Sequence, residues 1–171
     1  MLLIPHEIDV QVKFVSNVFL QKKGRAAHKD LSQCSNDELR FLCDFTQLNS
    51  FLYPTPAKVA TAQEIWQFIA ENPHIIISDM FNGYFQMHMD SRDYPYLGIM
   101  SPYKGLRIMA RSGQGLLNSD TELKELVSKV LGEEISQKKC KVVADDLVIG
   151  GKTITMAISN YEQVLLSLIH I

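Results

Sequence analysis

Short β-favouring runs alternate with three amphipathic segments along this chain, and this order constrains the fold more than any other feature. Each amphipathic segment begins at a serine or threonine that can cap a helix, and apolar residues follow at helical spacing. Helices are therefore predicted near 61–71, 119–136 and 153–169. The intervening runs predict strands at 17–23, 38–45, 74–78, 96–100, 105–110, 139–144 and 147–149. The order predicts an α+β fold, an antiparallel sheet with helices packed on one face.

Two details of the strand pattern add to this prediction. The run His74–Ser78 contains three consecutive isoleucines, which is typical of a buried central strand. The polar segment Gly24–Asp37 is predicted to be a surface loop, and the turn chemistry of Ser101–Lys104 predicts a hairpin between its flanking strands.

Composition excludes several classes of protein. With 171 residues, 46% hydrophobic and 21% charged, the chain resembles an ordinary single domain rather than a disordered one. The net charge of −2 argues against a strongly basic nucleic-acid-binding protein, although a local basic patch remains compatible with it. The three cysteines form no CxxC pair, so a zinc finger is not expected. Because no signal peptide and no long apolar run is present, a soluble, intracellular protein is predicted.

Aspartates border two of the predicted strands. Asp79 follows the isoleucine run directly, and Asp145 and Asp146 lie where two short strands meet. A carboxylate at the end of a core strand is costly unless it is solvated or paired with a cation. If the strands are neighbours, three hard oxygen ligands converge at one edge and suit Mg²⁺. The alternative is that Asp79 caps a turn and the Asp-Asp pair lies in an ordinary loop.

Four motifs in this order resemble the fingers and palm of a reverse transcriptase of the retroviral or LTR-retrotransposon kind. Arg40–Pro56 resembles the family's arginine strand with its D-F-x-x-L-N turn, and Ile76–Met89 its first catalytic-aspartate motif. Ser112–Ser119 resembles its Gln-Gly turn before a helix. Val143–Asp146 stands where the family carries an aromatic-x-Asp-Asp hairpin.

The resemblance implies one fingers-and-palm domain over 1–171. About 1–75 and 96–112 would be fingers-like, and 76–95 and 113–171 palm-like. The implied activity is RNA-directed DNA polymerisation, a two-metal nucleotidyl transfer onto a primer 3′-hydroxyl. The implied partners are an RNA or DNA template with its primer, and dNTPs. No membrane association is implied, and the implied location is the cytoplasm or an element particle. Since the sequence ends after the palm motifs, the thumb and RNase H regions are expected in a parent polyprotein, and little processive synthesis is expected from this chain alone.

The resemblance also implies a metal site. Asp79 and Asp145 would be the main ligands of two Mg²⁺ ions, for which Mn²⁺ could substitute, and Asp146 would be the third carboxylate. The backbone carbonyl of Met80 would assist one metal.

Other residues match the family's nucleotide contacts. Tyr84 would exclude a ribose 2′-hydroxyl, and without the motif it would be taken for a core aromatic residue. Arg40, with Lys22 or Lys23, would contact the triphosphate, although solvated strand ends commonly carry such residues. Gln114 would pack near the nucleotide, and its alternative role is that of a simple loop amide.

Two departures from the family pattern keep other functions open. Val143 replaces the expected aromatic residue, and Gly113 replaces the proline before the Gln-Gly turn. A non-catalytic, degraded remnant of such an element is one alternative to the polymerase. An unrelated α+β binding module is the other.

Overall fold

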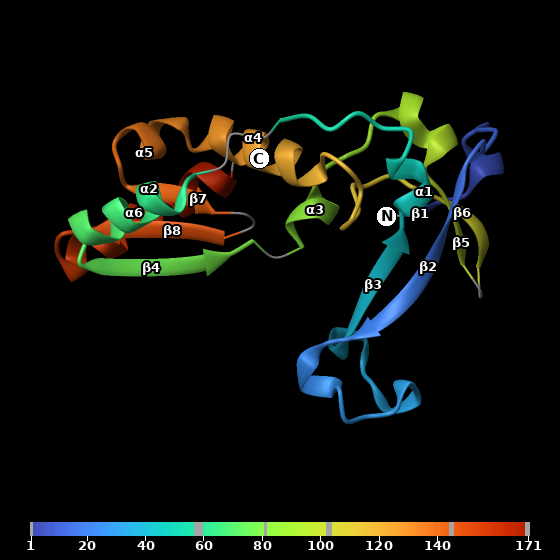
Figure 1. Cartoon of the computed structure of the whole chain (residues 1–171), viewed down its shortest axis with the longest axis horizontal. Coiled ribbons are helices and arrows are strands. Elements are labelled where there is room, and N and C mark those ends of the chain that lie inside the picture. The colour runs from blue at the N-terminus through green and yellow to red at the C-terminus, as the bar shows by residue number, and fades with distance from the viewer. Residues whose placement is uncertain (1, 57–59, 81, 102–103, 144–145, 170–171) are drawn as a thin grey trace. The chain divides into compact units, whose positions relative to one another are not determined.

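A computed structural model describes residues 2–56, 60–80, 82–101, 104–143 and 146–169. The chain, drawn in Figure 1, divides into two compact units. Unit 1 comprises Met1–Pro54 and Tyr84–Ser119, and unit 2 comprises Thr55–Gly83 and Asp120–Ile171. Within the described ranges, no helix combines the length and the apolarity needed to cross a bilayer.

Unit 1 contains a five-stranded mixed sheet. Its strands, in spatial order, are β1 (Leu2–Leu3), β6 (Gly105–Met109), β5 (Gly98–Ser101), β2 (Val15–Lys22) and β3 (Leu39–Asp44). Neighbours are antiparallel except β2 and β5, which run parallel. Outside the connection between β2 and β3, its short helices are η1 (Pro5–Glu7), α1 (Thr46–Asn49), α3 (Gly83–Gln86, whose first residue belongs to unit 2) and η5 (Ser91–Tyr96). The core lies where β3, α1, β5 and β6 meet, and Ile99 and Ile108 are fully buried in it.

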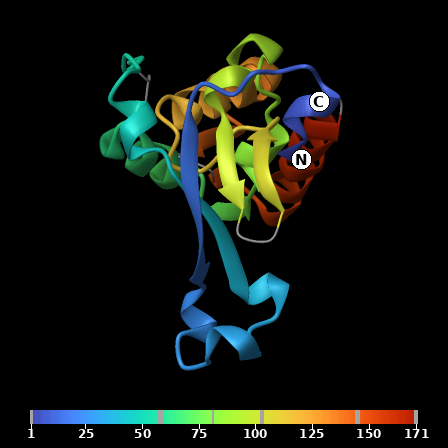
Figure 2. The same cartoon turned by 90° about the vertical axis from the view of Figure 1, so that its right-hand side faces the viewer.

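The strands β2 and β3 form a long ribbon, and Figure 2 shows the segment between them at its far end. This segment, the ribbon tip, is Lys23–Glu38 and contains three short 3₁₀ helices, η2 (Gly24–Ala26), η3 (Leu31–Gln33) and η4 (Asn36–Glu38). A loop without an apolar core needs polar contacts to hold one conformation. The tip therefore keeps its shape through side-chain hydrogen bonds.

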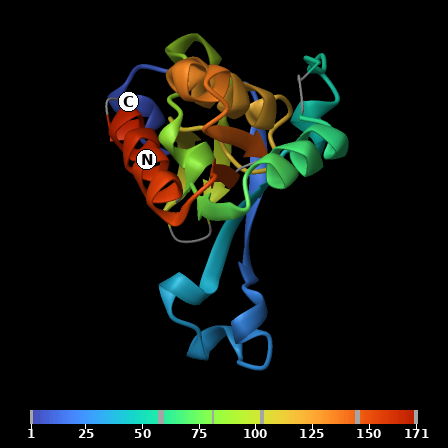
Figure 3. The same ribbon diagram turned by 90° about the vertical axis from the view of Figure 1, so that its left-hand side faces the viewer.

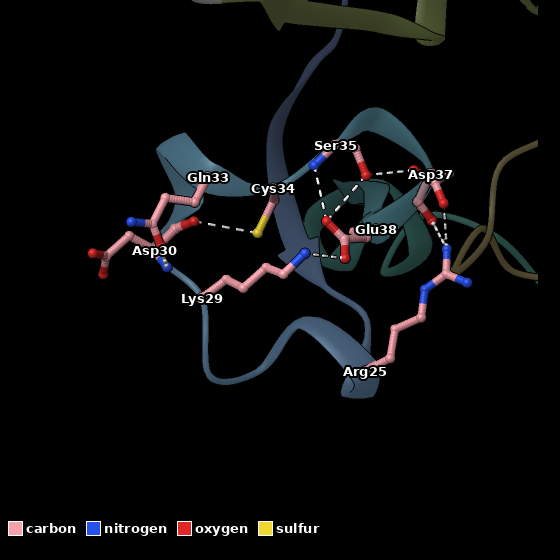
Figure 4. A network of polar contacts seen from close by, with 8 residues as sticks. All are labelled: Arg25, Lys29, Asp30, Gln33, Cys34, Ser35, Asp37 and Glu38. Carbon is pink, nitrogen blue, oxygen red and sulfur yellow. Dashed lines mark hydrogen bonds and ion pairs between the residues drawn. The ribbon is translucent and has the colours of Figure 1, made fainter.

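Two ion pairs organise the ribbon tip (Figure 4). Lys29 Nζ lies 2.6 Å from Glu38 Oε1, and Arg25 Nη2 lies 2.5 Å from Asp37 Oδ2. The backbone N–H of Ser35 donates to Glu38 Oε2 at 3.0 Å, and the Ser35 hydroxyl donates to the same oxygen. The hydrogen bond from Lys29, followed by those from Ser35, lowers the pKa of Glu38 from its ordinary 4.5 to about 2.

This pKa predicts how the ribbon tip responds to acid. A carboxyl group with a lowered pKa stabilises the fold above its ordinary pKa, and this stabilisation is lost as the pH falls through the lowered value. The tip should therefore stay ordered to about pH 4.5 and loosen between there and about pH 2. NMR titration of the Glu38 side chain should give a midpoint near 2, and Lys29→Met should move it upward. A midpoint near 4.5 in the wild-type chain would contradict the ion pair.

Unit 2 contains a three-stranded antiparallel sheet. Its strands, in spatial order, are β4 (His74–Asp79), β8 (Asp146–Gly151) and β7 (Cys140–Val143). Its helices are α2 (Ala62–Glu71), α4 (Ser119–Val130, whose first residue belongs to unit 1), α5 (Gly132–Ser136) and α6 (Ile154–Ile169). The predicted capping box of α2 is present, because Thr61 Oγ1 accepts from the Glu64 N–H and the Glu64 carboxylate accepts from the Thr61 N–H.

Helices pack closely on the central strand β8 because its end carries two glycines. A Cβ on Gly151 would lie 2.4 Å from the backbone nitrogen of Ala157 in α6. A Cβ on Gly150 would lie 2.8 Å from the ring of Phe68 in α2. Neighbouring strand residues point to opposite faces, so α6 and α2 cover opposite faces of the sheet, as Figure 3 shows.

The α+β class and the antiparallel palm-type sheet are confirmed, with helices against both faces of that sheet rather than one. The hairpin of β5 and β6, the last helix and both ribbon strands are also confirmed. The prediction of a central strand at 74–78 is wrong: in the described sheet β4 lies at an edge, and Ile77 is 69% exposed. The helix expected over 119–136 is divided at Leu131.

Candidate active site

Two aspartates face each other at one end of the sheet in unit 2. Asp79, the last residue of β4, is the register partner of Asp146, the first residue of β8. Residues directly opposite in an antiparallel pair have Cβ atoms about 4.5–5.5 Å apart and lie on the same face. Asp79 is exposed and Asp146 is half-buried. Two like charges in this position repel, so the pair favours a cation.

The face that carries this aspartate pair can be followed across the sheet. Val143 of β7 is the other register partner of Asp146, so the row reads Asp79, Asp146, Val143. Gly150 lies on the same face, two pairs of residues further along β8, where Phe68 of α2 covers it. The face is thus covered at one end and carries the carboxylates at the other.

The backbone after β4 is shaped by a tight turn. The carbonyl oxygen of Met80 accepts a hydrogen bond from the Gly83 N–H at 3.2 Å. Asn82 has a φ of 52°, a left-handed conformation that asparagine tolerates better than most residues. A carbonyl oxygen has two lone pairs, so this one hydrogen bond does not exhaust the acceptor capacity of the Met80 carbonyl.

The third predicted carboxylate, Asp145, lies outside the described residues, and its role stays a prediction. In the described part of the chain, no three His, Cys, Asp or Glu side chains are grouped closely enough to hold a metal ion. The thiols of Cys43 and Cys140 are buried, and burial raises the pKa of each to about 12. Both thiols are therefore protonated and poorly nucleophilic at neutral pH.

The predicted triphosphate contacts lie on the ribbon of unit 1. Arg40 is exposed and is the register partner of Gln21, while Lys22 pairs with Leu39. The Lys23 N–H donates to the Glu38 carbonyl at 2.8 Å, which continues the same register. Alternation then places Lys23 and Arg40 on one face of the ribbon and Lys22 on the other.

Lys22 has a different structural role from Lys23. Its Nζ donates to the carbonyl oxygens of Lys29 at 2.7 Å and of Ala27 at 3.2 Å. These bonds tie the end of β2 to the ribbon tip. The sequence left Lys22 and Lys23 as alternatives for contact with the triphosphate, and that role stays a prediction for both.

Gln114 is exposed in a turn that precedes α4. Gly115 adopts a φ of +92°, which suits glycine at this position. The Asn49 side chain at the end of α1 makes two hydrogen bonds with this turn. Its Nδ2 donates to the Gly115 carbonyl, and its Oδ1 accepts from the Leu117 N–H. Sequence reasoning assigned Asn49 no role, although it is the last residue of the D-F-x-x-L-N motif.

Tyr84 is half-buried in α3, five residues after Asp79 in the sequence. Its neighbour Phe85 packs against the core of unit 1. Part of the Tyr84 side chain is therefore accessible, and its contact with a nucleotide stays a prediction.

Comparison with known proteins gives similarity at the level of structure only. No protein-family model matches the chain, and no curated protein matches it in sequence. The solved structure of a prototype foamy virus protease-reverse transcriptase matches 94% of this chain with a TM-score of 0.75 and 18% identity. Foamy viral protease-reverse transcriptases in complex with an RNA/DNA hybrid and with double-stranded DNA match with TM-scores of 0.66 and 0.68, at 15% and 14% identity.

This chain spans between a fifth and a quarter of the length of those proteins, namely 20% of the first two and 25% of the third. At such low identity the likeness concerns the fold alone. The chain therefore has a fold like that of one part of a retroviral reverse transcriptase.

Proposed function

We propose that this chain is the fingers and palm of an RNA-directed DNA polymerase from a retrotransposon-like element, which adds deoxynucleotides to a primer 3′-hydroxyl. The observation that carries the proposal is the register pairing of Asp79 with Asp146 at one end of an antiparallel sheet. The likeness to reverse transcriptase structures supports it, as two of them contain a nucleic-acid duplex. Template, primer and dNTPs are the proposed partners.

The aspartate pair suits Mg²⁺ by the chemistry of its donors. Mg²⁺ is bound in proteins by one or two carboxylates together with substrate phosphates and water. Asp79 and Asp146 supply two carboxylates on one face, the Met80 carbonyl is a proposed further oxygen ligand, and Asp145 is the proposed third carboxylate. When bound, two such ions activate the attacking oxygen and stabilise the leaving pyrophosphate.

The remaining residues have proposed roles in binding the nucleotide. Lys23 and Arg40 share one ribbon face and would neutralise the triphosphate, with bidentate contacts from the arginine. The Tyr84 ring would select against ribonucleotides by excluding a 2′-hydroxyl, and Gln114 would contact the nucleotide from its turn.

A non-catalytic remnant is the second candidate, and Val143 favours it. Val143 lies beside Asp146 in the register, where reverse transcriptases carry an aromatic residue. The loss of a ring there removes packing surface for a primer end. The net charge of −2 also supplies little attraction for a duplex.

Single-nucleotide addition to a labelled primer on an RNA template, with the chain in excess and Mg²⁺ or Mn²⁺ present, tests the proposal. A polymerase should add one dNMP, even if processive synthesis needs the rest of a longer protein. Failure of both metals to support addition, together with no metal-dependent dNTP binding, would identify the remnant.

The two ribbon lysines provide a matched pair of variants. Lys23→Ala should weaken dNTP binding by about tenfold, because one charge-assisted hydrogen bond contributes about 1.5 kcal/mol or more. Lys22→Ala should leave dNTP affinity within about twofold and instead speed amide exchange in the ribbon tip, since its ammonium holds two tip carbonyls. Fluorescent-dNTP titration and hydrogen exchange measure the two effects. Equal losses of affinity in both variants would contradict the assignment.

A further inference from the structure

The turn that carries Gln114 is held by a side chain far away in the sequence. Asn49 Nδ2 donates to the Gly115 carbonyl at 2.9 Å, across 66 residues. The Leu117 N–H donates to Asn49 Oδ1 at 2.8 Å, across 68 residues. The amide group of Asn49 thus satisfies two backbone groups that follow Gln114 in the chain, the Gly115 carbonyl and the Leu117 N–H.

The ends of the same loop are fixed by other contacts. The hydroxyl groups of Ser112 and Ser119, both buried, share a hydrogen bond of 2.5 Å. A Cβ on Gly113 would lie 2.9 Å from the Phe45 ring, so the backbone here rests on the core. The Asn49 amide therefore acts on the middle of a loop whose ends are already in place.

We propose that Asn49 is a positioning residue that holds the Gln114 side chain where it meets the incoming nucleotide. This inference rests on the proposed function, since it assigns Gln114 a ligand. The position requires a hydrogen-bond donor and an acceptor on one short side chain, and asparagine has both. Aspartate lacks the donor and would bring a negative charge to the Gly115 carbonyl. Serine is too short to reach both groups.

Asn118 provides a matched control on the same loop. Its Nδ2 donates to the Tyr53 carbonyl at 2.9 Å, which also joins the loop to the segment after α1. This bond lies beyond Leu117 and away from Gln114. Loss of it should loosen the loop without moving the glutamine.

A double-mutant cycle on dNTP affinity tests the inference. Fluorescent dNTP is titrated into the chain with Mn²⁺, and folding of each variant is verified by circular dichroism. Gln114→Ala, Asn49→Asp and Asn49→Ser should each weaken binding about tenfold, the cost of roughly one hydrogen bond. Asn49→Asp combined with Gln114→Ala should weaken it no further, because Asn49 acts through Gln114. Asn118→Gly, which removes the side chain but accepts the left-handed backbone of this position (φ 72°), should stay within about twofold of wild type.

Several other outcomes would contradict the positioning role of Asn49. Additive losses in the double variant, or normal affinity in both Asn49 variants, would overturn the positioning role while the nucleotide site stands. Equal losses in Asn118→Gly would reduce Asn49 to general loop support and also overturn it. Absence of dNTP binding by the wild-type chain would overturn the proposed function, and this inference with it.

Discussion

On the proposed function, Asp79→Asn is expected to slow nucleotide addition severely and, in the absence of metal, to make the chain slightly more stable. The two effects have one cause, the register pairing of Asp79 with Asp146. Metal ions contribute several kcal/mol of transition-state stabilisation, so loss of a ligand should slow addition by more than about a hundredfold. Removal of one of two opposed like charges should raise the free energy of unfolding by about 0.2–1 kcal/mol.

Three measurements check this result. Mn²⁺ titration followed by electron paramagnetic resonance should show affinity lowered at least about tenfold in Asp79→Asn and in Asp146→Asn. Single-nucleotide addition and urea unfolding without metal complete the set. Glu125→Gln, which removes an exposed carboxylate from α4, serves as the control and should change none of the three. Lower stability of Asp79→Asn with unchanged Mn²⁺ affinity would show that Asp79 is only a strand-end residue.

Gly151→Ala is expected to be among the most destabilising single-methyl changes in the chain. The added Cβ would lie 2.4 Å from the Ala157 nitrogen and 2.8 Å from its Cα, both backbone atoms. Helix α6 would have to move away from β8, and overpacking of this kind costs about 1–3 kcal/mol. The movement would also strain the buried hydrogen bond from Asn160 Nδ2 to the Gly150 carbonyl, 2.8 Å long and worth about 1 kcal/mol.

Urea unfolding at 25 °C measures this loss. Gly132→Ala is the matched control, because a Cβ at Gly132 meets no atom within 4 Å and the residue lies in helix α5. The control should be neutral or more stable by about 0.4–1 kcal/mol, since alanine restricts the unfolded chain. Equal stability of the two variants would mean that α6 does not rest on β8.

Local sequence was sufficient for the longer strands, for most of the helical residues and for the placement of Asp79 and Asp146 at strand ends. The helix at 62–71 follows from Thr61 and Glu64, which cap it through bonds between residues three apart. The strands and the hairpin follow from apolar alternation and turn chemistry, which act over a few residues. Asp79 was expected at a strand exit and lies there, and Asp146 begins the strand that pairs with it.

Tertiary structure decided which strands and side chains meet. The isoleucine run looked central, yet β4 is an edge strand in the described sheet, because strand order depends on pairing with a segment some seventy residues away. Lys22 and Lys23 are neighbouring residues of the same type, and only the ribbon register shows that their side chains lie on opposite faces of the ribbon. The hydrogen bond from Asn49 to the Gly115 carbonyl likewise joins residues that are 66 positions apart in the sequence. Such contacts join distant parts of the chain, and no local pattern of residues records their register.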